Sequence, residues 1–240
     1  MKIGLLQSSY LPWLGFFDQI AKSEIFIFYD DVQFEEGSWR NRNRIKTKTG
    51  WSWLTVPVYK TGHFGQKIHE VKINNTIPWQ KKHLRAIYLN YHQTPYFGKY
   101  YHDIEKVLEQ NWEFLSELNV ELITYFCRVL GINTKLMSSI TLNNITGQKT
   151  DRIYSICRGL SADEIIVGAK AKNYLDEQLL TESGIKIEYQ EYRHPQYMQL
   201  YPPFIPYLSI IDLLFTEGDN SLEILYDKNG GIIVNSGETK

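Results

Sequence analysis

The chain has 240 residues, a formal net charge of −1 and 14% aromatic residues. A charge this close to zero excludes a protein-wide basic field for nucleic acid or anionic membranes, so any anion site has to be local. No apolar stretch approaches the roughly 20 residues of a membrane span, and Met1-Lys2 leads into an apolar run too short for a signal peptide, so we expect a cytoplasmic protein.

The first 30 residues predict a βαβ unit. Apolar runs predict strands over residues 2–6 and 25–29, and the segment over 15–22 between them has helical periodicity. Gly15 opens this helix, where the absence of a side chain allows the helix and the strand to approach closely. We therefore interpret Gly15 as a scaffold residue rather than a ligand contact.

Polar side chains follow both strands directly. Gln7 and Tyr10 come after the first strand, and Asp30, Asp31 and Gln33 come after the second. An amide or a phenol can contact a base or a sugar, and a carboxylate can bind a hydroxyl, take a proton from an attacking amine or hold Mg²⁺. Because α/β sheets bind ligands beyond the carboxyl ends of their strands, we expect a ligand crevice here. The alternatives are structural: a loop amide, a half-buried ring, and a carboxylate paired with a nearby arginine.

Cationic side chains occupy every second position of the next segment. They are Arg40, Arg42, Arg44, Lys46 and Lys48. In an extended strand all five would share one face, with Asn41 and Asn43 on the other. We predict that Arg40 and Arg42 hold a diphosphate or a carboxylate, with Asn41 as a further contact. The alternative is a solvated edge strand whose charges resist aggregation.

The middle of the chain predicts a hairpin followed by helices. Residues 51–59 and 67–73 read as two strands joined by a turn over 61–65. Three helices follow, over residues 78–91, 98–110 and 112–130. We interpret residues 78–131 as a helical insertion within one domain that spans residues 1–240.

The C-terminal part returns to alternation. Strands are predicted over 135–140, 164–167 and 185–189, and helices over 149–159, 172–181 and 209–215. This order predicts a three-layer, Rossmann-like α/β fold with a largely parallel sheet, an inserted β-hairpin and a helical subdomain. Cys127 and Cys157 lie within apolar helical patterns, so we expect buried free thiols.

Several stretches resemble the WbqC-like family of bacterial proteins. They are QSSYLPWLGFFDQI, FYDDVQF, WRNRNRIKT, WLTVPV, TGQKTDRIYSIC, the segment around Gly168 and Tyr174, YRHPQY and LSIIDLLFTEG. The family usually has Pro where this chain has Ser8, a difference that affects loop stiffness more than chemistry. The resemblance implies a role in surface-polysaccharide (O-antigen) synthesis, with transfer of an aminoacyl group, often glycyl, to an amino sugar.

Five further candidate contacts lie outside these strand ends. His194, in the bend Arg193-His194-Pro195-Gln196-Tyr197, is a candidate active-site base, with Tyr197 beside it. Lys82 and His83 share one helix, and Gly168 lies between a strand and a helix, where backbone N–H groups suit an anion. The histidine spacing does not match a zinc site, and neither a metal site nor a covalent nucleophile is predicted.

We therefore expect a transferase whose small-molecule substrate is a nucleotide-linked amino sugar. Arg40 and Arg42 would hold phosphate, Gln7 and Tyr10 would orient the sugar or base, and Asp30 or His194 would accept a proton. The sequence identifies no cofactor, and an aminoacyl-tRNA donor would be the one nucleic-acid partner. The alternatives are an adenylate-forming or nucleotidyltransferase-like enzyme, whose usual loop histidines are missing here, and a non-catalytic protein that binds sugar nucleotides.

Overall fold

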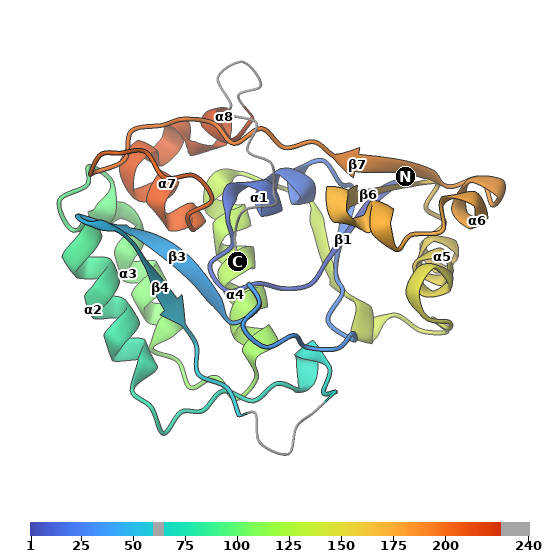
Figure 1. Ribbon diagram of the computed structural model, residues 1–240, viewed down its shortest axis with the longest axis horizontal. Helices are drawn as coiled ribbons and strands as arrows, with labels where there is room; N and C mark the ends of the chain where they lie inside the picture. Colours follow the sequence, from blue (N-terminus) through green and yellow to red (C-terminus); the bar gives the residue numbers. More distant parts are fainter. Residues whose placement is uncertain (60–64, 227–240) are drawn as a thin grey trace.

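Five parallel strands form the central sheet of the computed structural model (Figure 1). They are β1 (Lys2–Leu6), β2 (Ile25–Phe28), β5 (Lys135–Ser138), β6 (Glu164–Gly168) and β7 (Lys186–Gln190), in the order β5-β2-β1-β6-β7. The structure describes residues 1–59 and 65–226, so most of the turn predicted over 61–65 lies outside the described residues. Since the strands are parallel, their carboxyl ends meet at one edge of the sheet.

Helices pack on both faces of this sheet, with α1 and α4 in the core on one face and α5 and α6 in the core on the other. The α-helices of the described residues are α1 (Leu14–Ala21), α2 (Trp79–Tyr91), α3 (Phe97–Leu108), α4 (Leu115–Leu130), α5 (Lys149–Leu160), α6 (Glu177–Glu182), α7 (Ile210–Glu217) and α8 (Ser221–Leu225). Phe26 and Phe28 of β2 pack into a core with α1, α2, α3, α4 and α7, whereas Ile3, Leu5 and Ile27 pack into a second core with α5 and α6. Successive residues of β2 therefore point to opposite cores, as a pleated strand requires.

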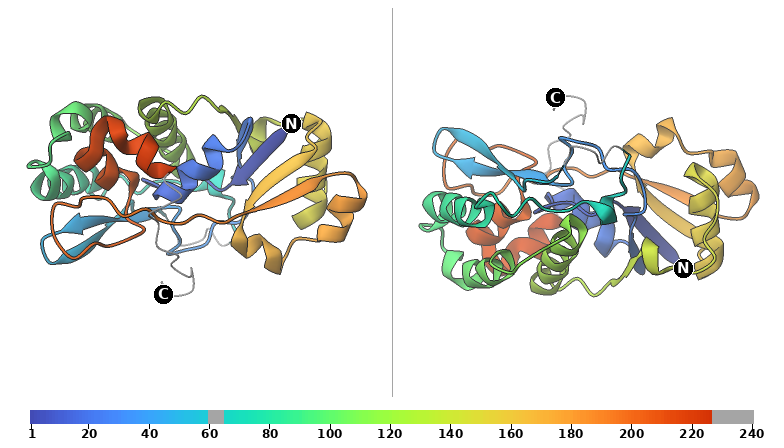
Figure 2. Two further views of the ribbon diagram at one scale, coloured as in Figure 1. Left: turned by 90° about the horizontal axis from the view of Figure 1, so that it is seen from above. Right: turned by 90° about the horizontal axis from the view of Figure 1, so that it is seen from below.

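An antiparallel hairpin forms a separate two-stranded sheet. Its strands are β3 (Arg42–Thr47) and β4 (Gly50–Thr55). Figure 2 shows this hairpin with α2, α3 and α7 at one end of the molecule, and α5, α6 and β7 at the other. The mixed α/β architecture and the inserted hairpin expected from the sequence are thus both present.

The predicted pairing of that hairpin was wrong. Residues 51–59 were expected to pair with 67–73, but β4 pairs with β3, and an isolated bridge between Val58 and Ile73 joins the two predicted strands. Gly50 has a φ of 139°, which allows the chain to reverse directly after β3. Closing this short turn costs less chain entropy than closing the longer predicted loop would.

Most other predicted elements are present within a few residues of their expected bounds. The helix predicted over 172–181 is divided into a 3₁₀ helix, Ala169–Asn173, and α6, because Asp176 accepts a hydrogen bond from the Leu179 N–H and caps a new helix. Cys127 and Cys157 are buried and free, as predicted. Within the described residues, no helix combines the length and the apolar character that crossing a bilayer demands.

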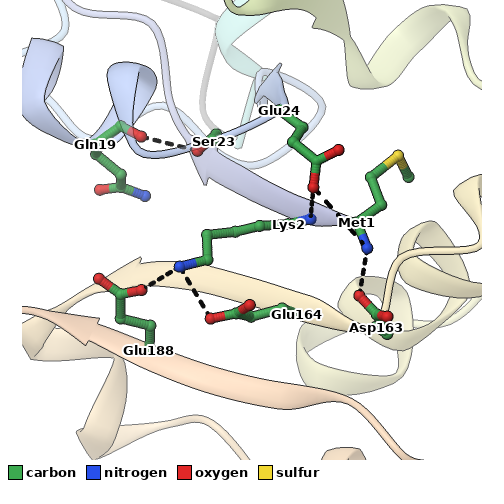
Figure 3. A network of polar contacts seen from close by, with 8 residues as sticks. All are labelled: Met1, Lys2, Gln19, Ser23, Glu24, Asp163, Glu164 and Glu188. Carbon is green, nitrogen blue, oxygen red and sulfur yellow. Dashed lines mark hydrogen bonds and ion pairs between the residues drawn. The ribbon is translucent and has the colours of Figure 1, made fainter.

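Ion pairs join the strands at the amino edge of the sheet (Figure 3). The Lys2 ammonium on β1 lies 2.9 Å from Glu164 on β6 and also contacts Glu188 on β7. The N-terminal ammonium of Met1 contacts Asp163. These contacts are partly exposed, so each adds little to stability. The candidate polar groups lie at the other end of the strands, where β1, β2 and β6 finish.

Candidate functional site

The two aspartates that follow β2 point to opposite faces of the sheet. Phe28 packs in the core that includes α4, and Asp30, two residues later, keeps that direction. Ile27 packs in the other core, and Asp31 turns toward α5, where it meets Arg152. The expected carboxylate pair is therefore divided into two separate sites that flank the end of β2.

Asp30 lies in a buried polar network on the α4 face. Its side chain is 2% exposed, and Oδ1 accepts a hydrogen bond of 2.8 Å from the backbone N–H of Ser8. Burial raises the pKa of Asp30, whereas the hydrogen bonds from Ser8 and the positive charge of Arg40 act against that rise. Arg40 in turn donates from Nη1 to the backbone oxygen of Gln7, at 2.8 Å. The network thus joins the ends of β1 and β2 to the segment before β3.

Asn119 of α4 completes this network. Its Nδ2 donates to the backbone oxygen of Arg40 at 2.9 Å and lies 3.5 Å from the Ser8 hydroxyl. Within the described residues, Arg40 Nε and Asn119 Oδ1 are buried and have no hydrogen-bond partner. Burial also lowers the pKa of Arg40 to about 10. A donor and an acceptor left unpaired in one network can each bond to a water molecule or to a polar ligand.

Asp31 lies in the second network, on the α5 face. Arg152 of α5 forms an ion pair with its carboxylate, and the Ser139 hydroxyl donates to it at 2.6 Å. Burial, and then the negative charge of Asp31, raise the pKa of the neighbouring Tyr29 to about 12. Sequence reasoning did not identify Arg152, although it lies in the motif TGQKTDRIYSIC that carries the family resemblance.

Gln7 and Gly168 lie at the carboxyl ends of adjacent strands, β1 and β6. Regular pairing of these strands ends at Gly4 and Ile166, and beyond it the buried Gln19 amide donates to the backbone oxygens of Leu5 and Ile166. Strand order reverses beside β1, which is the position where open parallel sheets bind ligands. Gln7 is half-buried, and its side-chain amide has no hydrogen bond to another described residue.

Tyr10 and His83 lie inside the helical core instead. Tyr10 is fully buried, and its hydroxyl and His83 Nδ1 are 2.8 Å apart. Both rings also pack against Trp79. Burial lowers the pKa of His83 to about 4, so this imidazole is neutral at pH 7. Lys82, the adjacent candidate, is exposed on α2.

Three of the five predicted cationic side chains, Arg42, Arg44 and Lys46, occupy alternate positions of β3 and so share one face, as predicted. Arg40 precedes the strand and Lys48 follows it. The pairing register places Arg44 opposite Trp53, and the Arg42 guanidinium lies 4.3 Å from the centre of the Trp53 ring. Lys46 is buried and donates to the backbone oxygen of Pro203. Pairing with the tryptophan-rich β4 therefore stacks two of the arginines on indole rings and leaves Arg40 alone in the Asp30 network.

Two candidate amides flank these networks. Asn41 is buried, and its Nδ2 donates to the backbone oxygen of Val56 at 2.9 Å. Gln33 is exposed, and its backbone forms a bridge with Lys67. Asn41 thus stabilises the local backbone, while Gln33 remains accessible.

His194 and Tyr197 lie in an aromatic cluster beside α7. The His194 ring is buried, stacks on Trp13 with a centroid distance of 6.4 Å, and contacts Tyr207. Burial lowers its pKa to about 4. The Tyr197 hydroxyl donates to Asp212 at 2.8 Å. The imidazole is therefore neutral at pH 7, and its ring contacts are aromatic side chains that do not belong to the Asp30 network.

The comparisons with known proteins match nearly all of the described chain. A model of the WbqC-like protein family matches residues 7–224. The chain belongs to this family. The uncharacterized protein Rv1507c of Mycobacterium tuberculosis is 40% identical over 226 residues, which cover 93% of this chain and 97% of that protein. No solved structure matches the chain.

Potential metal ligands do not cluster in the part of the chain that the structure describes. Within residues 1–59 and 65–226, no group of three or more His, Cys, Asp or Glu side chains is placed to hold a metal ion. Asp30 and Asp31 face apart, so they do not present two carboxylates to one Mg²⁺. The side chains at the site can instead pair an arginine with an anion, form amide hydrogen bonds, and accept a proton on a buried carboxyl group whose pKa is raised.

Proposed function

We propose that this WbqC-like protein is a transferase that binds an anionic sugar nucleotide at the carboxyl ends of β1, β2 and β6. One observation carries the proposal: Arg40 and Arg152, which are far apart in sequence, flank the end of β2, each beside one of its two aspartates. Arginine can bind phosphate oxygens through two parallel hydrogen bonds, each roughly twice as strong as a neutral one. Gln7 adds an amide that can orient the sugar.

The proposed reaction is acyl transfer to the amine of a nucleotide-linked amino sugar, in the synthesis of a surface polysaccharide. The amine nitrogen attacks the acyl carbon, a C–N bond forms, the bond to the leaving group breaks, and Asp30 accepts the proton that the amine loses. A raised carboxyl pKa makes Asp30 a stronger base than an ordinary aspartate. Positioning of the two substrates and stabilisation of charge supply most of the rate.

Isothermal titration with UDP-, dTDP- and GDP-linked amino sugars tests the binding step. We expect one of them to bind, and Arg152→Ala to weaken that binding about tenfold, because a charge-assisted hydrogen bond contributes about 1.5–3 kcal/mol. Arg158→Ala is the matched control, since Arg158 lies exposed on the same helix, α5. It should leave the affinity unchanged.

Two results would contradict this function. One is failure of every sugar nucleotide to bind the wild-type protein, and the other is equal affinity of the Arg152 and Arg158 variants. Tight binding without product, observed by mass spectrometry with a panel of acyl donors, would instead assign the protein to non-catalytic sugar-nucleotide binding.

A further inference from the structure

A groove of about 550 Å³ runs between α4 and the edge strand β5. On the α4 side it is lined by Val120, Thr124 and Arg128, which recur every four residues and so share one face of the helix. On the sheet side it is lined by Phe28 and Ser138. Its volume lies in the range that holds small-molecule ligands.

Residues that line one end of the groove are close neighbours in the chain of Asp30 and Asn119, although the Asp30 network does not itself line the groove. Phe28 precedes Asp30 by two residues on the same face of β2, and Ser138 is the register partner of Phe28 in β5. On the opposite wall, Val120 directly follows Asn119, which bonds to Arg40. We infer from this adjacency that this end of the groove is the one nearer to the proposed acyl-transfer site.

The other end of the groove carries a positive charge. Arg128 lies eight positions after Val120 in α4, which is about 12 Å along the helix axis. Arg128 is exposed, its guanidinium lies 5.5 Å from the centre of the Tyr125 ring, and no described carboxylate forms an ion pair with it. An anion fits at this end, remote from Asp30.

The lining between the two ends is mostly apolar, with a few polar groups. Phe28, Ile132 and Leu136 supply apolar surface, and Asn133 supplies an amide. Cys127 also lines the groove, but burial raises the pKa of its thiol to about 12, so it is not a nucleophile at pH 7. The lining therefore suits non-covalent binding of a chain that has both apolar and polar groups and carries an anion at the Arg128 end.

We propose that the α4–β5 groove binds the 4′-phosphopantetheine arm of an acyl thioester, with the thioester toward Asp30 and the phosphate toward Arg128. This inference rests on the proposed acyl transfer. The amine of the sugar attacks the thioester carbon, the C–S bond breaks, the C–N bond forms, and the amine proton passes through Asp30 to the leaving thiolate. The atoms and electrons balance without a further reactant.

The position of Arg128 distinguishes this donor from two others. In an acyl adenylate the phosphate is bonded directly to the acyl group, so a cation at the far end of the groove, such as Arg128, would have no part in binding it. An aminoacyl-tRNA is a polyanion that requires a broad basic surface, and the net charge of the chain is −1. In a pantetheine thioester, a long chain with two amides separates the acyl group from the phosphate.

Calorimetric titration with coenzyme A and with 4′-phosphopantetheine alone tests the groove. Both probes should bind the wild-type protein, and Arg128→Gln should weaken binding about tenfold. Thr124→Phe, which fills the middle of the groove, should abolish it. Arg85→Gln, at an exposed position of α2 away from the groove, is the control and should change nothing.

The outcomes separate this inference from the proposed function. Sugar-nucleotide affinity should be unchanged in all three variants, which also shows that they are folded. Equal affinity for the two probes supports a carrier-borne arm, and tighter binding of coenzyme A supports the free cofactor as the source. If a sugar nucleotide binds but neither probe does, or if Arg128→Gln binds both probes like the wild type, the groove proposal fails and the proposed function stands.

Discussion

Asp30 and Asp31 are consecutive residues whose surroundings differ. The first lies among Ser8, Arg40 and Asn119, and the second pairs with Arg152. The pleat of β2 causes this division, because successive side chains point to opposite faces. One dipeptide thus supplies a buried carboxyl group to one face of the sheet and an ion pair to the other, and only the first of these carboxyl groups takes the proton in the proposed reaction.

At the residue scale, Gly15 has a steric role that substitution can test. A Cβ at this position would overlap the Trp13 ring, so Gly15→Ala forces the indole to move. We expect a loss of about 1–3 kcal/mol in the free energy of unfolding, which is typical of overpacking. Urea denaturation measures this loss.

Gly98→Ala is the matched control for Gly15→Ala. Gly98 lies in α3, and no described heavy atom lies within 4 Å of the place that an added methyl group would take. The extra methyl should raise stability by up to about 1 kcal/mol, because alanine favours a helix. Equal effects of the two substitutions would show that Trp13 does not restrict Gly15.

At the scale of elements, Asp212 joins two helices and a loop. Its buried carboxylate accepts hydrogen bonds from Tyr91 of α2 and from Tyr197 and Gln199 of the loop before α7. Burial raises its pKa to about 6, although these donors oppose the rise. Since the folded carboxyl has the higher pKa, the folded state binds a proton more tightly than the unfolded state between about pH 4 and pH 6.

The sign of this shift predicts a pH dependence. As pH rises from about 4 to about 6, the contribution of Asp212 to stability should fall, because ionisation costs more in the folded state. Asp212→Asn removes that dependence, but it should cost about 1–3 kcal/mol at pH 4, because it leaves a buried donor without an acceptor. The gap between wild type and variant should therefore narrow toward pH 7. Parallel urea-denaturation profiles across this range would contradict the prediction.

The hairpin shows where sequence reasoning reached its limit at this scale. Alternation predicted a strand near residues 51–59, and β4 lies there. The pattern did not identify its partner, because β-strand pairing is decided by contacts across the chain rather than by local periodicity. Arg42 and Arg44 share one face of β3, as the alternation predicted, but the tryptophans of β4 lie on that face and stack with both guanidinium groups.

At the scale of the whole molecule, the parallel sheet was predictable and the composition of the site was only partly so. Short apolar runs that alternate with helical patterns placed Gln7 and Asp30 at strand ends without reference to distant contacts. Arg152 required tertiary structure, because a single arginine in a helix carries no signal of its partner. The sequence placed Tyr10 and His83 among the ligand contacts. It could not show that the two side chains are buried against each other, because that contact depends on how α2 packs.

The two edges of the sheet should separate stability from binding. Lys2 pairs with Glu164 and Glu188 at the amino edge, whereas the proposed sugar-nucleotide site lies at the carboxyl edge. Lys2→Ala should lower the free energy of unfolding by up to about 1 kcal/mol, with a smaller effect at high salt, because partly exposed pairs are screened. It should leave sugar-nucleotide affinity unchanged, in contrast to Arg152→Ala. Calorimetric titration of both variants with the sugar nucleotide measures this difference. An equal loss of affinity would mean that the ligand contacts the whole sheet or that strain passes between the two ends of the strands. Either result would remove the reason for assigning function to the ends of β1, β2 and β6.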